Sequence, residues 1–376
     1  MNAAPDVVVI GAGLVGTMTA LGLTEAGARV TLIESEFPGG GSTGAAMGHI
    51  VAMDDSPEQL ALCAHSRRRW GNLAASLPPS GEVDRCGTLW IAADDAELDA
   101  GRQRASAYAA QQVIAEVVDA RALYELEPHL RRGLAGGLLV PGDAVCYPPA
   151  IAHVLSDRVA AAGATVLRNV HVESIAPKVV RLADGATVAT DAIVIAAGVA
   201  SPDLVLGLPI VPRKGHLVIT DRHPEMVRHQ LVELGYMMSA HTFAAASVAF
   251  NVQPRRTGQL LIGSSRELVG FDPCINHQLL GTMLRRATEF LPALRGVRAL
   301  RTWVGFRPAT ADKLPLIGPW PAIPGVWIAA GHEGLGITMA TGTADLIVAG
   351  ILGTAPPIDP APFRPDRVMP AMAQAA

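Results

Sequence analysis

The hydrophobic pattern at the start of the chain predicts a strand, a helix and a second strand. A run of apolar β-forming residues covers 7–10, an Ala- and Leu-rich stretch over 17–26 is typical of a helix, and a second apolar run covers 30–33. Runs without polar alternation indicate strands buried on both faces of a parallel sheet. The same alternation of strand and helix returns in residues 148–198 and 325–352. The sequence therefore predicts an α/β fold with a Rossmann-like domain.

Three glycines follow the first strand, at the spacing Gly11, Gly13 and Gly16. Gly11 permits a tight turn, Gly13 lets the backbone approach a pyrophosphate, and Gly16 lets helix and strand pack closely. Glu34 ends the second strand, where a carboxylate accepts hydrogen bonds from the hydroxyls of an adenosine ribose. This complete context favours a dinucleotide site over a plain glycine-rich turn. By itself the motif fits NAD as well as FAD.

Two blocks without nucleotide features interrupt the α/β pattern. The first is typical of a strand over 85–92, a long polar-faced helix over 95–118 and a strand over 136–140. The second, from 210 to 305, alternates apolar runs with Pro, Gly and polar turns. We expect an inserted antiparallel β-sheet with covering helices, which forms a second, substrate-binding domain. The predicted nucleotide-binding domain comprises 1–84, 147–208 and 306–376, and the predicted substrate-binding domain comprises 85–146 and 209–305.

Small residues are concentrated in three later segments. Residues 42–50 contain Ser, Thr, Gly and Ala without a Lys, Arg, Asp or Glu, which favours backbone lying against a planar ligand over an exposed flexible loop. The strand over 191–198 ends in Ala-Ala-Gly, and a second strand, glycine turn and helix begins at 325. This last unit lacks an acidic ribose partner. We expect it to contact another part of the same ligand.

Composition narrows the class of protein. Half of the 376 residues are hydrophobic, 17% are charged, and the formal net charge is −4. A weakly acidic chain without a Lys/Arg tract gives no reason to expect nucleic acid as a partner. No apolar run reaches the length of a membrane span, so we expect a cytoplasmic protein, and peripheral attachment to the inner membrane stays open. The four scattered cysteines predict reduced thiols, with neither a metal site nor an iron–sulfur cluster on this chain.

Together these features resemble the D-amino-acid oxidase-like family of FAD-dependent oxidoreductases, which includes glycine oxidase, sarcosine oxidase and D-amino-acid dehydrogenase. The resemblance covers nearly the whole chain. It rests on the glycine motif with Glu34, the loop at 42–50, the strand end at 196–198, Gly305–Thr310 and the glycine turn at 331–337. Three phrases most resemble the D-hydroxyproline dehydrogenase branch, which shares ancestry with opine oxidases, namely Ala46–Asp55, Arg213–Thr220 and Gly331–Ile337.

The resemblance implies FAD as the cofactor. Relatives with covalent flavin use a His in the early loop or a Cys near the C-terminus, but Ala45 takes the first position here and no Cys follows Cys274, so the FAD is expected to be non-covalent. The glycine motif would meet the pyrophosphate, Val172 the adenine, and the early loop with the last glycine turn the isoalloxazine. The implied cofactor-binding residues are Gly11, Gly13, Gly16, Glu34, Ser42, Thr43, Met47, Gly48, His49, Val172, Ala197, Gly198, Gly331, Gly334, Leu335, Gly336, Ile337 and Thr338.

Oxidation of an amino or imino acid requires a fixed carboxylate and a Cα–H directed at the flavin. An arginine fork suits the carboxylate, and Arg307 matches the family's position for it; the alternative is a surface arginine. Glu333 either attracts the ring ammonium of a cyclic amino acid or caps the last helix. His49 either lies over the flavin and binds a substrate hydroxyl, or is a satisfied interior histidine. The expected lining residues of the substrate pocket are Asn251, Tyr236 and His241.

Three functions fit these features. The first is oxidation of cis- or trans-4-hydroxy-D-proline, or of D-proline, by hydride transfer from Cα to flavin N5, with a dye, a quinone or an iron–sulfur partner subunit as electron acceptor. The second is the catalytic flavin subunit of an opine- or glycine-oxidising complex, within a homo- or hetero-oligomer. The third is a flavoprotein that binds or transfers electrons without a substrate of its own. The sequence leaves the acceptor and the exact substrate open.

Overall fold

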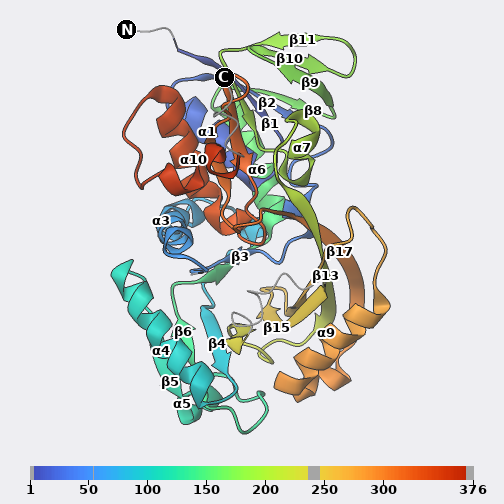
Figure 1. The fold of residues 1–376 in the computed structure, drawn as a ribbon. Helices are drawn as coiled ribbons and strands as arrows, with labels where there is room; N and C mark the ends of the chain where they lie inside the picture. The colour runs from blue at the N-terminus through green and yellow to red at the C-terminus, as the bar shows by residue number, and fades with distance from the viewer. Residues whose placement is uncertain (1–3, 54, 236–245, 370–376) are drawn as a thin grey trace.

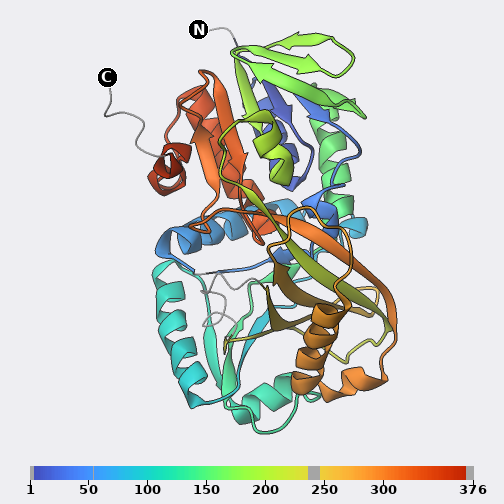
Figure 2. The ribbon, with the colours of Figure 1, turned by 45° about the vertical axis from the view of Figure 1, so that its right-hand side comes forward.

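The computed structural model describes residues 4–53, 55–235 and 246–369, which fold around two large β-sheets (Figures 1 and 2). In both views one sheet with its helices forms the upper part of the molecule and the other sheet forms the lower part. Helix α3 (Pro57–Ala74) lies at the level where the two parts meet. Within the described ranges, no helix has the length and apolar character needed to cross a membrane.

The upper sheet has six strands in the order β18-β19-β12-β1-β2-β8. They are β1 (Asp6–Ile10), β2 (Arg29–Glu34), β8 (Thr165–Arg168), β12 (Ala192–Ile195), β18 (Leu316–Pro319) and β19 (Val326–Ala330). The pairings from β8 to β19 are parallel, and β18 is antiparallel to β19. The predicted α/β class with a Rossmann-like sheet is confirmed.

Both faces of this sheet are covered, which explains the unbroken apolar run of β1. Val7 and Val9 belong to the core shared with α1 (Leu14–Glu25) and α10 (Gly336–Leu352). Val8 belongs to a second core, which it shares with the small sheet on the opposite face. That small sheet consists of β9 (Val172–Ala176), β10 (Val179–Leu182) and β11 (Thr187–Ala189). Helix α6 (Pro148–Ala161) packs beside α1.

The lower sheet has eight strands in the order β17-β13-β16-β15-β14-β4-β6-β5. They are β4 (Thr88–Ala92), β5 (Glu116–Asp119), β6 (Gly136–Val140), β13 (Val211–Arg222), β14 (Gln230–Glu233), β15 (Ala246–Pro254), β16 (Gln259–Glu267) and β17 (Ala299–Ala309). Its pairings are antiparallel apart from β14 with β4.

Three helices border the lower sheet: α4 (Asp95–Ala110), α5 (Ala120–Leu126) and α9 (His277–Phe290). Helix α9 packs on β15, where the rings of Phe250 and Phe290 stack with centroids 4.6 Å apart. Short elements complete the fold: α2 (Ser42–Ala45), β3 (His49–Ile50), β7 (Ala144–Val145), α7 (Ser201–Leu204), and 3₁₀ turns at Pro79–Gly81, Gly198–Ala200, Pro292–Gly296, Ala361–Phe363 and Pro365–Val368.

Three elements of the structure differ from the expectation. The helix expected over 95–118 ends at Ala110, because the chain turns at Gln112 (φ 58°) and then pairs as β5 with β6. Within the α/β pattern predicted for 148–198, the chain breaks at Asn169 (φ 57°), so that β8 joins the large sheet and β9 the small one. Strand β14 was not predicted, since its four residues carry too short a pattern.

The two sheets are built from interleaved parts of the chain. Strands β1 to β2 belong to the upper sheet, β4 to β6 to the lower one, β8 and β12 to the upper again, β13 to β17 to the lower, and β18 and β19 to the upper. Strand β17 continues from 299 to 309, through the domain boundary predicted at 305/306. The exact domain boundaries stay predictions.

Candidate functional site

A cavity of about 540 Å³ lies between the two sheets. Its upper wall contains the carboxyl ends of the central parallel strands, represented by Ile10, Ile33 and Ala196. Its lower wall is one face of the lower sheet, from β17 across to β4. Cofactors of doubly wound α/β proteins bind at the carboxyl ends of the strands, so this is the place where a dinucleotide is expected.

The glycine turn has no room for side chains. A Cβ on Gly11 (φ 102°) would lie 2.6 Å from the Ala196 carbonyl oxygen, and one on Gly16 would lie 1.8 Å from the Gly11 oxygen. Gly13 is the N-cap residue of α1 and provides no side-chain cap, which leaves the helix N-terminus available to an anion. The turn therefore fits a pyrophosphate that approaches the backbone.

Glu34 holds this turn and lines the cavity at the same time. Its Oε2 accepts a hydrogen bond of 2.7 Å from the Ala12 backbone N–H, and its Oε1 accepts one of 3.0 Å from Glu36. A carboxylate has lone pairs beyond these two bonds. Glu34 can therefore accept from ribose hydroxyls without giving up its contacts to the protein.

Ser42 and Thr43 both line the cavity, but their hydroxyl protons differ in availability. The Ser42 hydroxyl donates to the Phe306 carbonyl at 2.6 Å, so its proton is already used. The Thr43 hydroxyl accepts from the Leu14 backbone N–H at 3.2 Å and keeps its own proton for a phosphate oxygen. Of the two, Thr43 is the better phosphate donor in this arrangement.

Most of the other predicted cofactor residues line the cavity as well: Met47, Gly48, His49, Val172, Ala197, Gly198, Gly334, Leu335, Gly336 and Ile337. Three further predicted residues do not line the cavity, namely Gly16, Gly331 and Thr338. They shape the backbone next to it. The Thr338 hydroxyl donates to the His49 carbonyl and accepts from the Val51 N–H, both at 3.0 Å, and so ties the early loop to α10. The predicted lining residues Tyr236 and His241 lie outside the described residues.

Arg307 lines the lower wall and is not a surface residue. Its Nη1 donates to the Ser265 carbonyl at 3.0 Å, so the side chain reaches from β17 across β13 to β16. It passes over Gly215, where a Cβ would lie 2.2 Å from the same nitrogen. Burial lowers the pKa of Arg307, and Glu333 opposes that effect. The guanidinium of an arginine still stays protonated at neutral pH.

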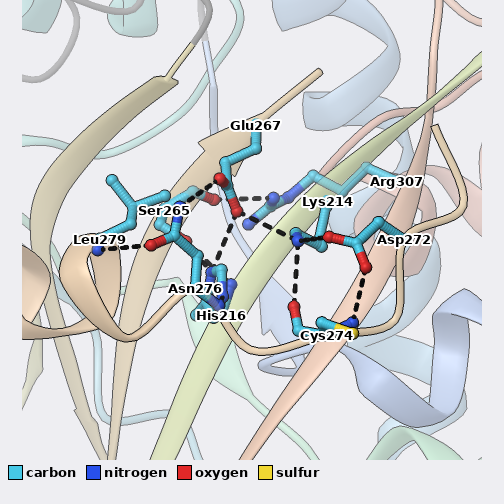
Figure 3. A network of polar contacts seen from close by, with 9 residues as sticks. All are labelled: Lys214, His216, Ser265, Glu267, Asp272, Cys274, Asn276, Leu279 and Arg307. Atoms are coloured by element: carbon cyan, nitrogen blue, oxygen red, sulfur yellow. Dashed lines mark hydrogen bonds and ion pairs between the residues drawn. The ribbon is translucent and has the colours of Figure 1, made fainter. Parts of the chain in front are cut away.

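A polar network behind Arg307 holds its acceptor strand in place (Figure 3). The Ser265 hydroxyl accepts from both the backbone N–H of His216, at 2.9 Å, and its Nδ1, at 2.8 Å. His216 Nε2 in turn accepts from the Asn276 N–H at 2.9 Å. Lys214, only 1% exposed, donates to Asp272 at 2.8 Å. These contacts fix β16 and the segment after it, and through Ser265 they orient Arg307.

Glu333 lies among arginines. Its Oε1 is 2.9 Å from Arg213 Nη1 and 3.4 Å from Arg266 Nε. Burial acts to raise the pKa of Glu333, but Arg266, Arg213 and Arg307 together outweigh it and lower the pKa. No side chain caps α10. Of the two alternatives for Glu333, capping of the last helix is therefore wrong, because the arginines on β13 and β16 hold its carboxylate.

His49 lines the cavity, and its Nε2 is buried without a hydrogen-bond partner in the described structure. Burial lowers the pKa of His49 to about 4, so the ring is neutral at pH 7. This unpaired nitrogen favours a histidine that faces a ligand over a satisfied interior histidine. The site also contains Trp90, Gln230 and Arg266, which sequence reasoning missed. The sequence offers no alternation that would mark Arg266, because its neighbours Ser265 and Glu267 are polar as well.

The strand order, the glycine turn and the cavity at the strand ends define a Rossmann-like protein that binds a dinucleotide. The family model for "FAD dependent oxidoreductase" matches residues 6–349. The chain belongs to this family, and FAD is its cofactor. The fit is visible in the structure, where the glycine turn leaves space that any Cβ would fill.

Named relatives agree with this assignment. The chain is 30% identical to a glycine oxidase of Pseudomonas aeruginosa, over 96% of this chain and 98% of the relative. It is also 30% identical to a D-amino acid dehydrogenase of Methylobacterium nodulans, over 72% of this chain and 65% of the relative. The crystal structure of glycine oxidase from Geobacillus kaustophilus matches with a TM-score of 0.85 and 26% identity, over 98% of this chain and 100% of that one.

Proposed function

We propose that this protein is an FAD-dependent dehydrogenase of a cyclic D-amino acid, with cis- or trans-4-hydroxy-D-proline as the leading substrate and D-proline as the next. In this reaction the substrate loses a hydride from Cα and a proton from nitrogen, and the Cα–N bond becomes a double bond. The bound FAD supplies the two-electron acceptor. The protein's own residues bind the carboxylate, orient Cα and exclude water.

One observation carries the proposal, the arrangement of Arg307. Within the described chain, Ser265 is the one hydrogen-bond acceptor of its guanidinium, which otherwise faces the cavity. A planar fork of N–H donors binds a carboxylate through two parallel hydrogen bonds. Such a contact would fix both the position and the rotation of the substrate.

The amine of the substrate needs an acceptor and no positive neighbour. His49 is neutral at pH 7, because burial lowers its pKa to about 4, and its Nε2 has no partner among the described groups. It can accept a hydrogen bond from the substrate amine or from a substrate hydroxyl. Since a group of such low pKa is a weak base, we assign His49 a positioning role and not proton abstraction.

A second candidate is oxidation of an opine, an amino acid that carries another carboxylate on its nitrogen substituent. The observation in its favour is Arg266, which lines the same cavity as Arg307. Two guanidinium groups facing one cavity suit a substrate with two carboxylates. The relatives named as glycine oxidases and D-amino acid dehydrogenase support a small amino acid in either case.

Electrons would leave to a quinone or to an iron–sulfur partner subunit, and to a dye in the test tube. A glycine-oxidising complex and a flavoprotein without a substrate of its own stay as alternatives. The cytoplasmic location, the non-covalent attachment of FAD and the partner subunits all stay predictions.

The test is anaerobic mixing of the FAD-loaded protein with single compounds. The panel contains cis- and trans-4-hydroxy-D-proline, D-proline, glycine and an opine, and loss of the absorbance of oxidised flavin reports the reaction. We expect the hydroxyprolines to bleach the flavin fastest. Bleaching only by the opine would favour the second candidate, and bleaching by none of the compounds would favour a flavoprotein without a substrate.

Arg307→Lys then tests the carboxylate contact. The lysine keeps the charge but loses the two-pronged geometry, and one charged hydrogen bond contributes about 1.5–3 kcal/mol. We expect KM to rise about 10- to 100-fold, with FAD content unchanged. Arg121→Lys, on the exposed side of α5 and 3.9 Å from Glu125, is the matched control and should leave KM unaltered. An unchanged KM in Arg307→Lys would remove Arg307 from the site.

A further inference from the structure

The lower wall of the cavity contains a row of side chains from three neighbouring strands. Trp90 on β4 lies directly opposite Val232 on β14, and Val232 lies directly opposite Asn251 on β15. Directly opposed residues project from the same face of a sheet, and so does Gln230, two positions before Val232. All four residues line the cavity.

Their chain neighbours point the other way, which confirms the orientation of the row. Leu231 and Val252 belong to the hydrophobic core beside α9. Glu233 also projects from this opposite face, and its carboxylate accepts hydrogen bonds from the Phe250 N–H and from Arg286. The Glu233 carboxylate, on the face away from the cavity, is thus paired within the protein.

Three polar atoms of the row itself are not paired in this way. Trp90 Nε1, Gln230 Oε1 and Asn251 Oδ1 are buried without a hydrogen-bond partner in the part of the chain that the structure describes. The three residues are 1%, 2% and 8% exposed. Buried polar atoms in proteins are nearly always hydrogen bonded. Three unpaired atoms in one row, all from residues that line one cavity, are therefore placed to form hydrogen bonds with a bound molecule.

This row lies within reach of a small molecule bound to Arg307. The Arg307 guanidinium contacts Ser265 on β16, and Asn251 pairs with Gly263, two residues before Ser265 on that strand. One strand spacing and two residues along a strand separate Ser265 from Asn251 by roughly 8 Å. Met47 lies next to Gly263, where a Cβ would be 2.7 Å from its sulfur. The row thus adjoins the loop expected to lie against the flavin.

The chemistry of the row selects the ligand group. It has no ionisable side chain, one group that can only donate, the Trp90 indole N–H, and two amides that both donate and accept. An ammonium group can only donate hydrogen bonds, so it would leave the Trp90 indole N–H without an acceptor. A hydroxyl accepts from the indole N–H and donates to an amide oxygen, so it satisfies both kinds of partner.

We propose that Trp90, Gln230 and Asn251 form a subsite that binds an uncharged hydroxyl group on the part of the substrate opposite its carboxylate. This inference rests on the proposed function in one respect, namely that Arg307 holds the carboxylate. It assigns to the enzyme a preference for hydroxylated over unsubstituted amino acids. It also assigns that preference to residues which need not take part in the oxidation itself.

Binding of simple carboxylates tests the subsite independently of catalysis. Calorimetry on the FAD-loaded protein compares 4-hydroxybutanoate with butanoate, which differ only in the hydroxyl, and with succinate, which replaces it by a second carboxylate. We expect 4-hydroxybutanoate to bind about 10-fold more tightly than butanoate, the effect of one to two net hydrogen bonds. Equal affinities of these two compounds, or tightest binding of succinate, would overturn the proposal.

Two near-isosteric variants locate the effect. Asn251→Leu and Gln230→Met remove the amides at nearly constant volume, and each should reduce the 10-fold preference to about 2-fold while leaving butanoate affinity unchanged. Gln278→Met, on the exposed face of α9, is the matched control and should keep the full preference. A preference that persists in both subsite variants would refute the assignment, and unaltered FAD content and melting temperature show that they fold.

The same measurements separate this inference from the proposed function. Arg307→Lys should weaken 4-hydroxybutanoate and butanoate equally, because both share the carboxylate. If the hydroxyl preference depends on Asn251 but Arg307→Lys changes neither affinity, the subsite stands and the carboxylate assignment fails. If the flavin is bleached by D-proline and 4-hydroxy-D-proline at equal rates, and the rates stay equal in Asn251→Leu, the subsite fails and the proposed function stands.

Discussion

Replacement of Glu333 by glutamine tests whether a single carboxylate neutralises the arginines at the cavity wall. The substitution keeps the size of the side chain and removes its charge. Arg213 and Glu333 are 6% and 11% exposed as side chains, so solvent screens their 2.9 Å contact only weakly. Arg266 lies 3.4 Å from the same oxygen. The variant therefore leaves two buried guanidinium groups without this counter-charge.

The distances give the magnitude. With an effective dielectric constant of about 20, charges 2.9 and 3.4 Å apart attract by about 6 and 5 kcal/mol before desolvation is subtracted. Removal of one partner from a buried ion pair costs about 3–5 kcal/mol in measured cases. A chain of this length has an unfolding entropy near 0.8 kcal/mol per kelvin, so we expect a drop in Tm of about 4 to 6 °C.

The assay is thermal unfolding at pH 7 and a fixed excess of FAD. Glu125→Gln is the matched control, because Glu125 makes a solvent-exposed pair with Arg121 at 3.9 Å. Exposed pairs of this kind contribute about 0–1 kcal/mol, so the control should shift Tm by about 1 °C or less. Equal shifts in the two variants would refute the reasoning.

The pH dependence provides a second readout. The pKa of Glu333 in the folded protein lies below the usual value of about 4.5, since the arginines outweigh burial. The stability that the carboxylate contributes is therefore present above pH 4.5 and is lost as the pH falls through the lower folded pKa. The Tm difference between the parent protein and Glu333→Gln should be constant from pH 8 to pH 5.5 and should shrink below pH 4.5. A difference that grows on acidification would contradict this assignment.

Two further predictions concern buried groups outside the proposed chemistry. His332 is hydrogen bonded to the Thr343 hydroxyl at 2.8 Å, and burial lowers the pKa of His332 from 6.5 to about 3. The stability that the neutral ring contributes is therefore present above pH 6.5, and the free energy of unfolding should fall by about 2 kcal/mol between pH 7 and pH 5. Denaturant titrations at both pH values should show this loss in the parent protein and not in His332→Asn. Gly342 on α10 has no room for a Cβ, which would lie 2.4 Å from the Ser66 hydroxyl oxygen, so Gly342→Ala should cost about 1–3 kcal/mol. Gly281→Ala on α9 is its control, since the nearest atom is 3.6 Å away, and it should instead stabilise by about 0.5–1 kcal/mol.

Local signals were enough to predict the dinucleotide end of the site. The apolar run of β1, the glycines after it and Glu34 lie within one short segment, and the steric need for glycine at Gly11 and Gly16 is a property of the turn itself. The resemblance to FAD-dependent oxidoreductases followed from such segments, and the family match over residues 6–349 confirmed it. Arg307 was predicted in the same way, from the residues directly around it.

Long-range pairing decided the rest of the site. The residues around Glu333 are typical of the start of a helix, yet arginines from β13 and β16 hold its carboxylate. No local pattern in the sequence predicts this pairing. Strand register alone brings Gln230 and Asn251 beside Trp90, although they follow it in the chain by 140 and 161 positions. β14 was too short to be recognised from its sequence.

The sequence by itself therefore determined the class of protein and its cofactor, because backbone conformation at glycines and apolar strands is encoded within a few neighbouring residues. Only the tertiary structure decided which charges are paired and which polar groups are left facing the cavity. Those properties depend on which strands lie side by side and on how far each side chain is removed from water.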